Sequence, residues 1–314
     1  MANFNNPSTH KEFCMQISQE NLDTLFTSYS DAFNKGIGLV PPVFERLAMT
    51  IPSMSGENIY GWLKDVPGMR EWMGDRVMNS PIVDGYRIQN KKFESTIAVK
   101  GDDIEDDQYG IYEPLFTMLG ENAARHPNDL AFEVLSEGFT TPCFDGKKFF
   151  DTEHPVLDKH GKEQSVSNFM GGTDTAWYLA CTTRTIKPLI FQTRKRAELV
   201  RITSPKSHKV FMTGDFLYGV DARYNVGFGL WKTIIASKQP LTKESYEAAR
   251  MALTTMPKDY GKLLALTADL LIVPPSLESA ARRLMCSTLV GVDGVTEGNI
   301  WKGASEVLVS PWLK

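Results

Sequence analysis

The stretch of chain from residue 51 to residue 99 has the pattern of a long two-stranded hairpin, and no other feature restricts the fold as strongly. In its returning half, Ile88 lies on one side of the predicted strand, whereas Phe93 and Val99 lie on the other. The phase of this alternation changes near Asn90, which predicts a bulge or a bend there. Because an isolated hairpin is only marginally stable in water, this one must pack against something else.

The hairpin carries large aromatic side chains but little core of its own. Residues 67–74, between its strands, predict a helical turn near the tip. Each large aromatic side chain removes roughly 150–250 Å² from water, which at about 25 cal/mol per Å² amounts to several kcal/mol before ordering costs. We therefore expect the hairpin to pack on a neighbouring chain through four candidate interface residues: Trp62, Trp72, Ile88 and Phe93.

The first 50 residues contain too few apolar side chains to build a core alone. A short amphipathic helix is expected over residues 18–33, where Leu22, Leu25 and Tyr29 stand near helical spacing. The glycines and prolines that follow are expected to end it. This opening segment needs another surface to lie against, and we expect it to be buried, like the hairpin, on neighbouring subunits.

A second helical region follows an acidic cluster at residues 102–107. Negative charge is favoured near a helix N-terminus, and Pro114 suits an early helical position. Pro127 is expected to kink this region or to restart it as a second helix, and Gly138 to stop it. The acidic cluster lacks the glycine and the terminal glutamate of a calcium-binding EF-hand loop.

The second half of the chain predicts a mixture of helices and strands. Thr242 is expected to cap a helix that ends near residue 256, and residues 270–273 to form a short buried strand that stops at two prolines. Ser276 is expected to cap the next helix, and residues 306–310 to form a last strand.

The balance of charge indicates a protein that does not bind nucleic acid through its phosphates. The chain of 314 residues has 34 basic and 38 acidic residues, and its net charge is −4. A phosphate-binding protein would normally show a basic excess or a basic stripe. The most basic stretch, residues 194–196 with Lys206 and Lys209, is interpreted as a solvated face, with a subunit contact or a DNA-facing patch as the weaker alternative.

Membrane insertion and a disulfide framework are also disfavoured. No apolar run approaches the roughly 20 residues that cross a bilayer, and the start of the chain lacks the pattern of a signal peptide. The 4 cysteines are widely separated and form no C-x-x-C pair, which indicates reduced thiols. These observations predict synthesis as a soluble cytoplasmic protein.

One turn-rich segment offers residues that could carry chemistry. Cys143 with His154, or His154 with Asp151, could form part of a nucleophilic dyad or triad, but their surroundings match no known nucleophile signature. Asp151, Glu153, His154 and His160 could bind a metal, although their spacing matches no standard site. Neither a Walker A motif nor a dinucleotide-binding fingerprint is present. We expect no catalytic, cofactor-binding or metal-binding residues, and interpret the segment as a loop anchored by two adjacent phenylalanines.

The run NIYGWLKDVPGMREW at residues 58–72 is the longest of several motifs that resemble those of Mu-like prophage major head subunits. The other matching stretches are residues 92–94, 103–107, 110–114, 141–146, 149–155, 187–190, 273–275 and 310–313. The matches run in order over almost the whole chain, and the first 50 residues carry the least of the resemblance.

This resemblance implies an α+β chain with the Hong Kong 97 type of phage capsid fold. It places an N-terminal arm at residues 1–50 and an extended E-loop hairpin at 51–101. A peripheral domain with a spine helix is expected at 102–174 and an axial domain at 175–300. A C-terminal strand, within residues 301–314, is expected to return to the peripheral domain.

The resemblance also implies a structural protein and not an enzyme. It is expected to self-assemble into the hexamers and pentamers of an icosahedral tailed-phage head, with no cofactor and no membrane contact. Implied partners are a portal, a scaffold or protease, and decoration proteins, around double-stranded DNA bound without sequence specificity. The expected location is the virion, and the host cytoplasm during assembly. Two alternatives stay open: an encapsulin-like nanocompartment shell protein, and a soluble hydrolase that uses Cys143 and His154.

Overall fold

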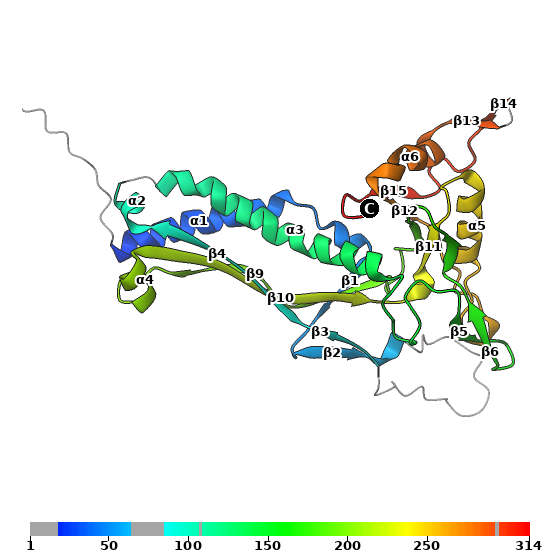
Figure 1. Ribbon diagram of the computed structural model, residues 1–314, viewed down its shortest axis with the longest axis horizontal. Coiled ribbons are helices and arrows are strands. Elements are labelled where there is room, and N and C mark those ends of the chain that lie inside the picture. Colours follow the sequence, from blue (N-terminus) through cyan, green and yellow to red (C-terminus); the bar gives the residue numbers. More distant parts are fainter. Residues whose placement is uncertain (1–17, 64–84, 107–108, 293–294) are drawn as a thin grey trace, which may run out of the picture. The chain divides into compact units, whose positions relative to one another are not determined.

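The computed structural model describes residues 18–63, 85–106, 109–292 and 295–314. Within these residues the chain forms two compact units. Unit 1 draws its described residues from 18–41, 92–126 and 195–223, and unit 2 from 42–91, 127–194 and 224–314. Both helices and strands are present, which agrees with the expected α+β class (Figure 1).

In unit 1, helices pack against long strands (Figure 1). The helices are α1 (Gln19–Leu39) and the N-terminal half of α3 (Glu113–Glu137). The strands are β4 (Lys91–Lys100) and the larger parts of β9 (Leu189–Ile202) and β10 (Asp215–Phe228), which lie in the order β9-β10-β4. Two short helices, α2 (Gly101–Glu105) and α4 (His208–Thr213), and the turn η3 (Tyr109–Tyr112) complete the unit.

Helix α1 finds the surface that it needs within its own chain. Ser18 caps its first turn, because the hydroxyl oxygen accepts a hydrogen bond from the N–H of Asn21 (3.2 Å). Tyr29 stacks on Phe116 of α3 with ring centroids 4.1 Å apart, and it meets Tyr218 of β10 edge-on at 5.3 Å. All three rings are almost completely buried. This corrects the expectation that the opening helix depends on a neighbouring subunit for its burial.

Two glycines bring α1 and α3 into close contact. A Cβ atom on Gly36 of α1 would stand 2.0 Å from the carbonyl oxygen of Thr117, and one on Gly120 of α3 would stand 2.1 Å from that of Phe33. The helices therefore approach backbone to backbone at this crossing. The expectation that Gly36 helps to end the helix is wrong, since α1 continues to Leu39 and the glycine serves the crossing.

Helix α3 runs through Pro127 as one element of 25 residues, so the expected restart as a second helix is wrong. A proline inside a helix removes one hydrogen bond and costs about 3 kcal/mol. Burial on the following turns offsets this cost, because Phe132 and Leu135 are completely buried and Trp312 stacks on Phe132 at 5.2 Å. Gly138 follows the last helical residue, as predicted.

Unit 2 is built on a five-stranded sheet with the order β15-β12-β8-β11-β7. Its strands are β7 (Phe169–Gly172), β8 (Trp177–Ala180), β11 (Ile234–Lys238), β12 (Leu270–Val273) and β15 (Glu306–Val309). Strand β12 pairs in parallel with β15 and antiparallel with β8, and all of its residues are buried. The two predicted strands at the end of the chain are thus confirmed.

Two helices accompany this sheet, α5 (Lys243–Thr254) and α6 (Glu278–Cys286). Thr242 caps α5 as predicted, in a reciprocal pair of hydrogen bonds with Ser245. Ser276 does not cap α6, because it lies inside the turn η6 (Pro275–Leu277) and the N-cap position falls on Leu277. That predicted cap is wrong by one residue, since the two prolines at 274 and 275 first form a tighter turn.

The base of the predicted hairpin is present in unit 2. Strand β2 (Glu57–Tyr60) pairs antiparallel with β3 (Tyr86–Gln89). The extended chain is then interrupted at Asn90, and β4 begins at the next residue. The Asn90 side chain is buried, and its Nδ2 donates to the Ser53 hydroxyl and to the Ser55 carbonyl, each at 2.9 Å. The predicted irregularity is therefore confirmed as a hydrogen-bonded joint. The expected helical turn at residues 67–74 lies outside the described residues.

The remaining elements are short. They are β1 (Ala48–Pro52), β5 (His154–Leu157), β6 (Glu163–Val166), β13 (Leu289–Val292), β14 (Val295–Gly298), η1 (Val43–Arg46), η2 (Gly61–Leu63), η4 (Trp231–Thr233) and η5 (Asp259–Gly261). Each compact unit is assembled from three separate stretches, so neither coincides with one of the five segments predicted from the sequence, and those boundaries stay predictions. No helix in the described part of the chain is long and apolar enough to span a membrane.

The glycine crossing in unit 1 can be tested with a matched pair of variants. Gly36→Ala should lower the free energy of unfolding by about 1–3 kcal/mol, because the backbone of α3 cannot yield to the new methyl group. Gly38→Ala, in the same helix but with nothing within 4 Å, should leave it unchanged or raise it by up to about 1 kcal/mol. Urea unfolding of both variants measures this, and equal effects at the two positions would contradict the proposed close approach.

Candidate functional site

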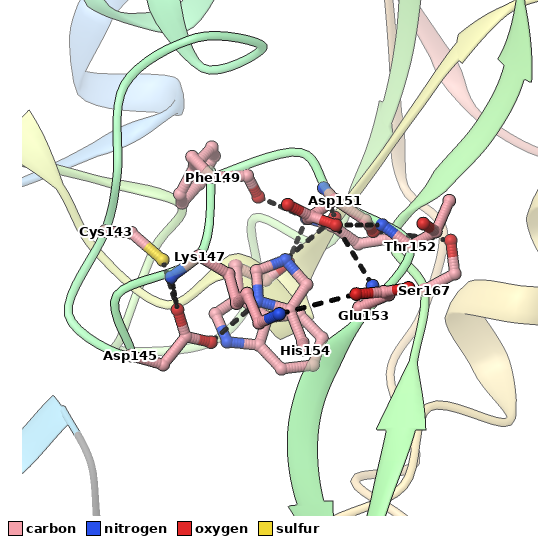
Figure 2. A network of polar contacts seen from close by, with 11 residues as sticks. Cys143, Asp145, Lys147, Phe149, Asp151, Thr152, Glu153, His154 and Ser167 are labelled. Carbon is pink, nitrogen blue, oxygen red and sulfur yellow. Dashed lines mark hydrogen bonds and ion pairs between the residues drawn. The ribbon is translucent and has the colours of Figure 1, made fainter.

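Three side chains that could take part in catalysis or metal binding lie close together in unit 2, at the start of β5 (Figure 2). They are Cys143, Asp145 and His154. A tight turn positions them: the N–H of Gly146 donates to the carbonyl of Cys143 (3.1 Å), and Gly146 adopts a φ of 84° that favours glycine. This turn holds Asp145 beneath His154, which is the first residue of β5.

Asp145 joins Cys143, Lys147 and His154 in the polar network of Figure 2. One carboxylate oxygen accepts hydrogen bonds from the Cys143 thiol (3.1 Å) and from the Lys147 N–H (3.0 Å). The other oxygen lies 2.7 Å from Nδ1 of His154. Burial by itself would raise the pKa of Asp145, but the hydrogen bond and charge of His154, with the bonds from Cys143 and Lys147, outweigh it and lower that pKa.

His154 is completely buried and is held on three sides. Its ring stacks on Trp231 with centroids 3.8 Å apart and an angle of 12° between the planes. Its Nε2 lies 3.2 Å from the side-chain oxygen of Asn168, which is itself completely buried. The same Asn168 oxygen accepts the N–H of Asp151 at 3.0 Å. The network therefore joins the loop at residues 143–154 to the residue that directly precedes β7.

Among the residues that the structure describes, the Cys143 thiol has no partner that would activate it as a nucleophile. Burial, and secondly the negative charge of Asp145, raise its pKa, so the reactive thiolate is disfavoured. Its hydrogen bond goes to Asp145 and not to His154. The dyad considered from the sequence is thus not assembled, and the two phenylalanines at 149 and 150 are buried, as expected of an anchored loop.

The same three side chains form the one group within the described residues that could hold a metal ion, with ligand atoms all within 4.8 Å of one another. Two ligands on a tetrahedral zinc, each about 2.0–2.2 Å from the metal, would stand roughly 3.3 Å apart. The 2.7 Å separation of His154 and Asp145 instead matches a hydrogen bond.

The other residues considered for metal binding do not join this group. The Asp151 carboxylate accepts the backbone N–H groups of Thr152 (2.7 Å) and Glu153 (3.1 Å). The Glu153 side chain pairs with Lys147 at 3.4 Å. His160 is exposed, in the turn between β5 and β6.

The four interface candidates have different environments. Trp72 lies outside the described residues. Trp62 is half-buried and meets Tyr60 edge-on at 6.0 Å, and Phe93 is half-buried against the ring of His126 at 4.3 Å. Ile88 is only 3% exposed, in a core cluster of unit 2, so its burial requires no neighbouring subunit. Interface roles for these residues stay predictions. Ile88 was proposed because the hairpin was expected to have little core of its own, and its burial within unit 2 removes that reason.

An exposed apolar pair in unit 1 was not identified from the sequence. Phe211 is 80% exposed and Met212 is 66% exposed, both on the short helix α4 between β9 and β10. The signal available was an apolar run, residues 210–212, directly after Lys209 of the most basic stretch, which was interpreted as a solvated face with a subunit contact as the weaker alternative. Adjacent exposed apolar side chains make this helix a candidate contact surface.

The role of Cys143 as a hydrogen-bond donor can be tested by two substitutions. Cys143→Ala removes one of the donors to buried Asp145 and should lower the free energy of unfolding by about 1–3 kcal/mol. Cys143→Ser keeps a donor at this position and should cost less, and neither change should affect assembly. Thermal unfolding and particle imaging measure these effects, and a serine variant less stable than the alanine variant would contradict the assignment.

Comparison with known proteins identifies the family. The model of the family described as "Mu-like prophage major head subunit gpT" matches residues 22–313. The chain is 36% identical to the major capsid protein of Escherichia phage Mu over 305 residues, covering 95% of this chain and 100% of that protein. It is 39% identical to the Mu-like prophage FluMu major head subunit of Haemophilus influenzae over 293 residues, covering 91% and 95% of the two chains.

Solved structures agree with this result. A chain in the procapsid of bacteriophage JBD30 superposes with a TM-score of 0.82 at 36% identity, covering 95% of this chain and 100% of that one. A chain in the JBD30 capsid decorated with minor capsid protein trimers superposes with a TM-score of 0.71 at 28% identity, covering 88% and 92%. The chain belongs to the Mu-like prophage major head subunit family.

Proposed function

We propose that this chain is the major capsid subunit of a Mu-like phage head, and that copies of it form the hexamers and pentamers of an icosahedral shell around double-stranded DNA. The observation that carries this proposal is the similarity to phage capsid subunits over nearly the full length of the chain. On this basis the protein is structural and not an enzyme, and the Hong Kong 97 type of fold follows from the same relatives.

The subunit must bind copies of itself in several nearly equivalent environments. Head-to-tail contacts between identical subunits generate closed rings when the rotation closes. Phe211 and Met212 supply exposed apolar area for such contacts, and half-buried Trp62 and Phe93 supply more. We assign these four residues to contacts between subunits, together with Trp72 of the hairpin.

The charge of the chain suits a wall around packaged DNA. A strongly basic inner surface would hold DNA through counterion release, with a steep dependence on salt. The net charge of −4 avoids this and leaves the genome free to move during packaging and ejection. DNA is therefore enclosed by the shell and is not bound by sequence.

The further partners are proposed from the same relationship. They are a portal, a scaffold or protease, and decoration proteins; the JBD30 capsid decorated with minor capsid protein trimers supports the last of these. Assembly is assigned to the host cytoplasm, before the subunit becomes part of the virion.

Neither alternative has comparable support. A nanocompartment shell would share the fold, but both curated relatives quoted above are phage or prophage head proteins. A hydrolase would require Cys143 to be activated by His154, whereas both side chains bind Asp145.

Expression of the full chain tests the proposal directly. Size-exclusion chromatography and negative-stain imaging should show rings or closed shells, alone or after co-expression with the phage scaffold and portal. A subunit that stays monomeric under all of these conditions would overturn the assignment.

The contact role of Phe211 is tested by a polar and a conservative substitution. Phe211→Ser should reduce the yield of assembled particles at least several-fold, because it removes exposed apolar area that assembly buries. Phe211→Leu should retain most of the yield. Neither variant should change thermal unfolding of the free subunit, since the side chain is exposed there. Full assembly of the serine variant would show that α4 is not a contact.

A further inference from the structure

The orientation of the Asn168 side chain is fixed by its neighbours (Figure 2 shows the surrounding network). Its Nδ2 donates to the carbonyl oxygens of Phe149 (2.8 Å) and Trp231 (3.3 Å). Its Oδ1 accepts the backbone N–H of Asp151 (3.0 Å). If the amide were flipped, its oxygen would face the carbonyl oxygens of Phe149 and Trp231, and its NH2 group would face the N–H of Asp151. The atom that faces His154 is therefore an acceptor.

This orientation determines which nitrogen of His154 carries hydrogen. Because Nε2 lies 3.2 Å from the Asn168 oxygen, Nε2 must carry the N–H that donates to it. A neutral imidazole has one N–H, so its Nδ1 would then be a lone pair. That lone pair would face the Asp145 carboxylate at 2.7 Å, which is a contact between two acceptors. A second proton must lie between His154 and Asp145.

The surroundings place this proton on the histidine. The Asp145 carboxylate already accepts hydrogen bonds from the Cys143 thiol and the Lys147 N–H, both of which favour its charged form. The ring of His154 lies flat on Trp231, an arrangement that favours a cation over the indole face. We infer that His154 is held as an imidazolium ion, paired with Asp145, and that this buried ion pair is a pH-sensitive lock on the loop from residue 143 to residue 168.

Other charged groups lie near the pair. The Lys232 ammonium stands 5.3 Å from the Trp231 ring centroid. Burial lowers the pKa of Lys232, and the charges of Asp259 and Asp145 act against this shift. Lys147 pairs with Glu153, at 3.4 Å. A cavity of about 340 Å³ lies beside Asp145, and Trp231 and Lys232 also line it.

The lock has a limit at acid pH. The pKa of Asp145 is lower in the folded protein than its ordinary value, so this carboxylate contributes stability above the ordinary value, and the contribution is lost as the pH falls through the lower, folded value. The loop should therefore lose stability as the solution becomes acid.

Nitrogen-15 NMR of the histidine rings tests the inference. In protein labelled only at histidine, the His154 signal is assigned by replacing each of the other histidines with glutamine in turn. At neutral pH, both ring nitrogens of His154 should carry hydrogen. A wild-type His154 with either ring nitrogen bare would overturn the inference, as would a bound metal ion at one per chain that is lost on Cys143→Ser.

A single substitution supplies the matched control. In Asp145→Asn the amide Nδ2 can donate to Nδ1, so His154 should become neutral, with hydrogen on Nε2 alone, while the loop keeps its shape. At neutral pH the melting temperature of the wild type should exceed that of Asp145→Asn, because the variant loses the ion pair. Equal melting temperatures would contradict the lock, and the wild-type spectrum decides its charge state even where the variant does not fold.

Discussion

The contact between α1 and α3 determines how the rest of unit 1 can be built. Gly36 and Gly120 allow the two backbones to touch, and this brings Tyr29 over Phe116 and against Tyr218 of the strand below. Without that approach the three rings could not share one core. The contact closes the apolar core of the unit inside a single chain, so its folding does not depend on neighbours. Contacts between subunits can then be individually weak and reversible, as assembly of a closed shell requires.

Unit 2 uses buried polar side chains at the places where its chain changes direction. Gln192, completely buried, accepts from the Tyr60 hydroxyl (2.8 Å) and donates to Asn90 (2.9 Å) at the break between β3 and β4. Asp145 and His154 form a comparable joint at the base of β5. Each buried polar group is costly if left unpaired, so such a joint tolerates one geometry and excludes others. Buried hydrogen bonds thus fix the conformation of loops that the apolar packing of the sheet alone would not determine.

Much of the fold could be predicted where the cause is local in sequence. The cap at Thr242, the stop at Gly138, the buried strand at residues 270–273 and the break at Asn90 each follow from neighbouring residues, and each was predicted. The helix crossing could not be predicted, because the partner of Gly36 is a carbonyl about eighty positions away in the chain. The burial of Ile88 depends in the same way on its packing against Ile190. At the loop site, sequence identified Cys143 and His154 but not Asp145 as their shared partner, since no pattern specifies which carboxylate a turn will bring beneath a strand.

If each subunit completes its own core before it joins a shell, hydrogen–deuterium exchange of free and assembled subunits will show it. Amides of α1 should exchange slowly in free subunits and equally slowly in assembled particles, whereas amides of α4 should gain protection only on assembly. Fast exchange of α1 in free subunits, with protection appearing only in the particles, would show that the opening helix folds on a neighbour and would contradict the account.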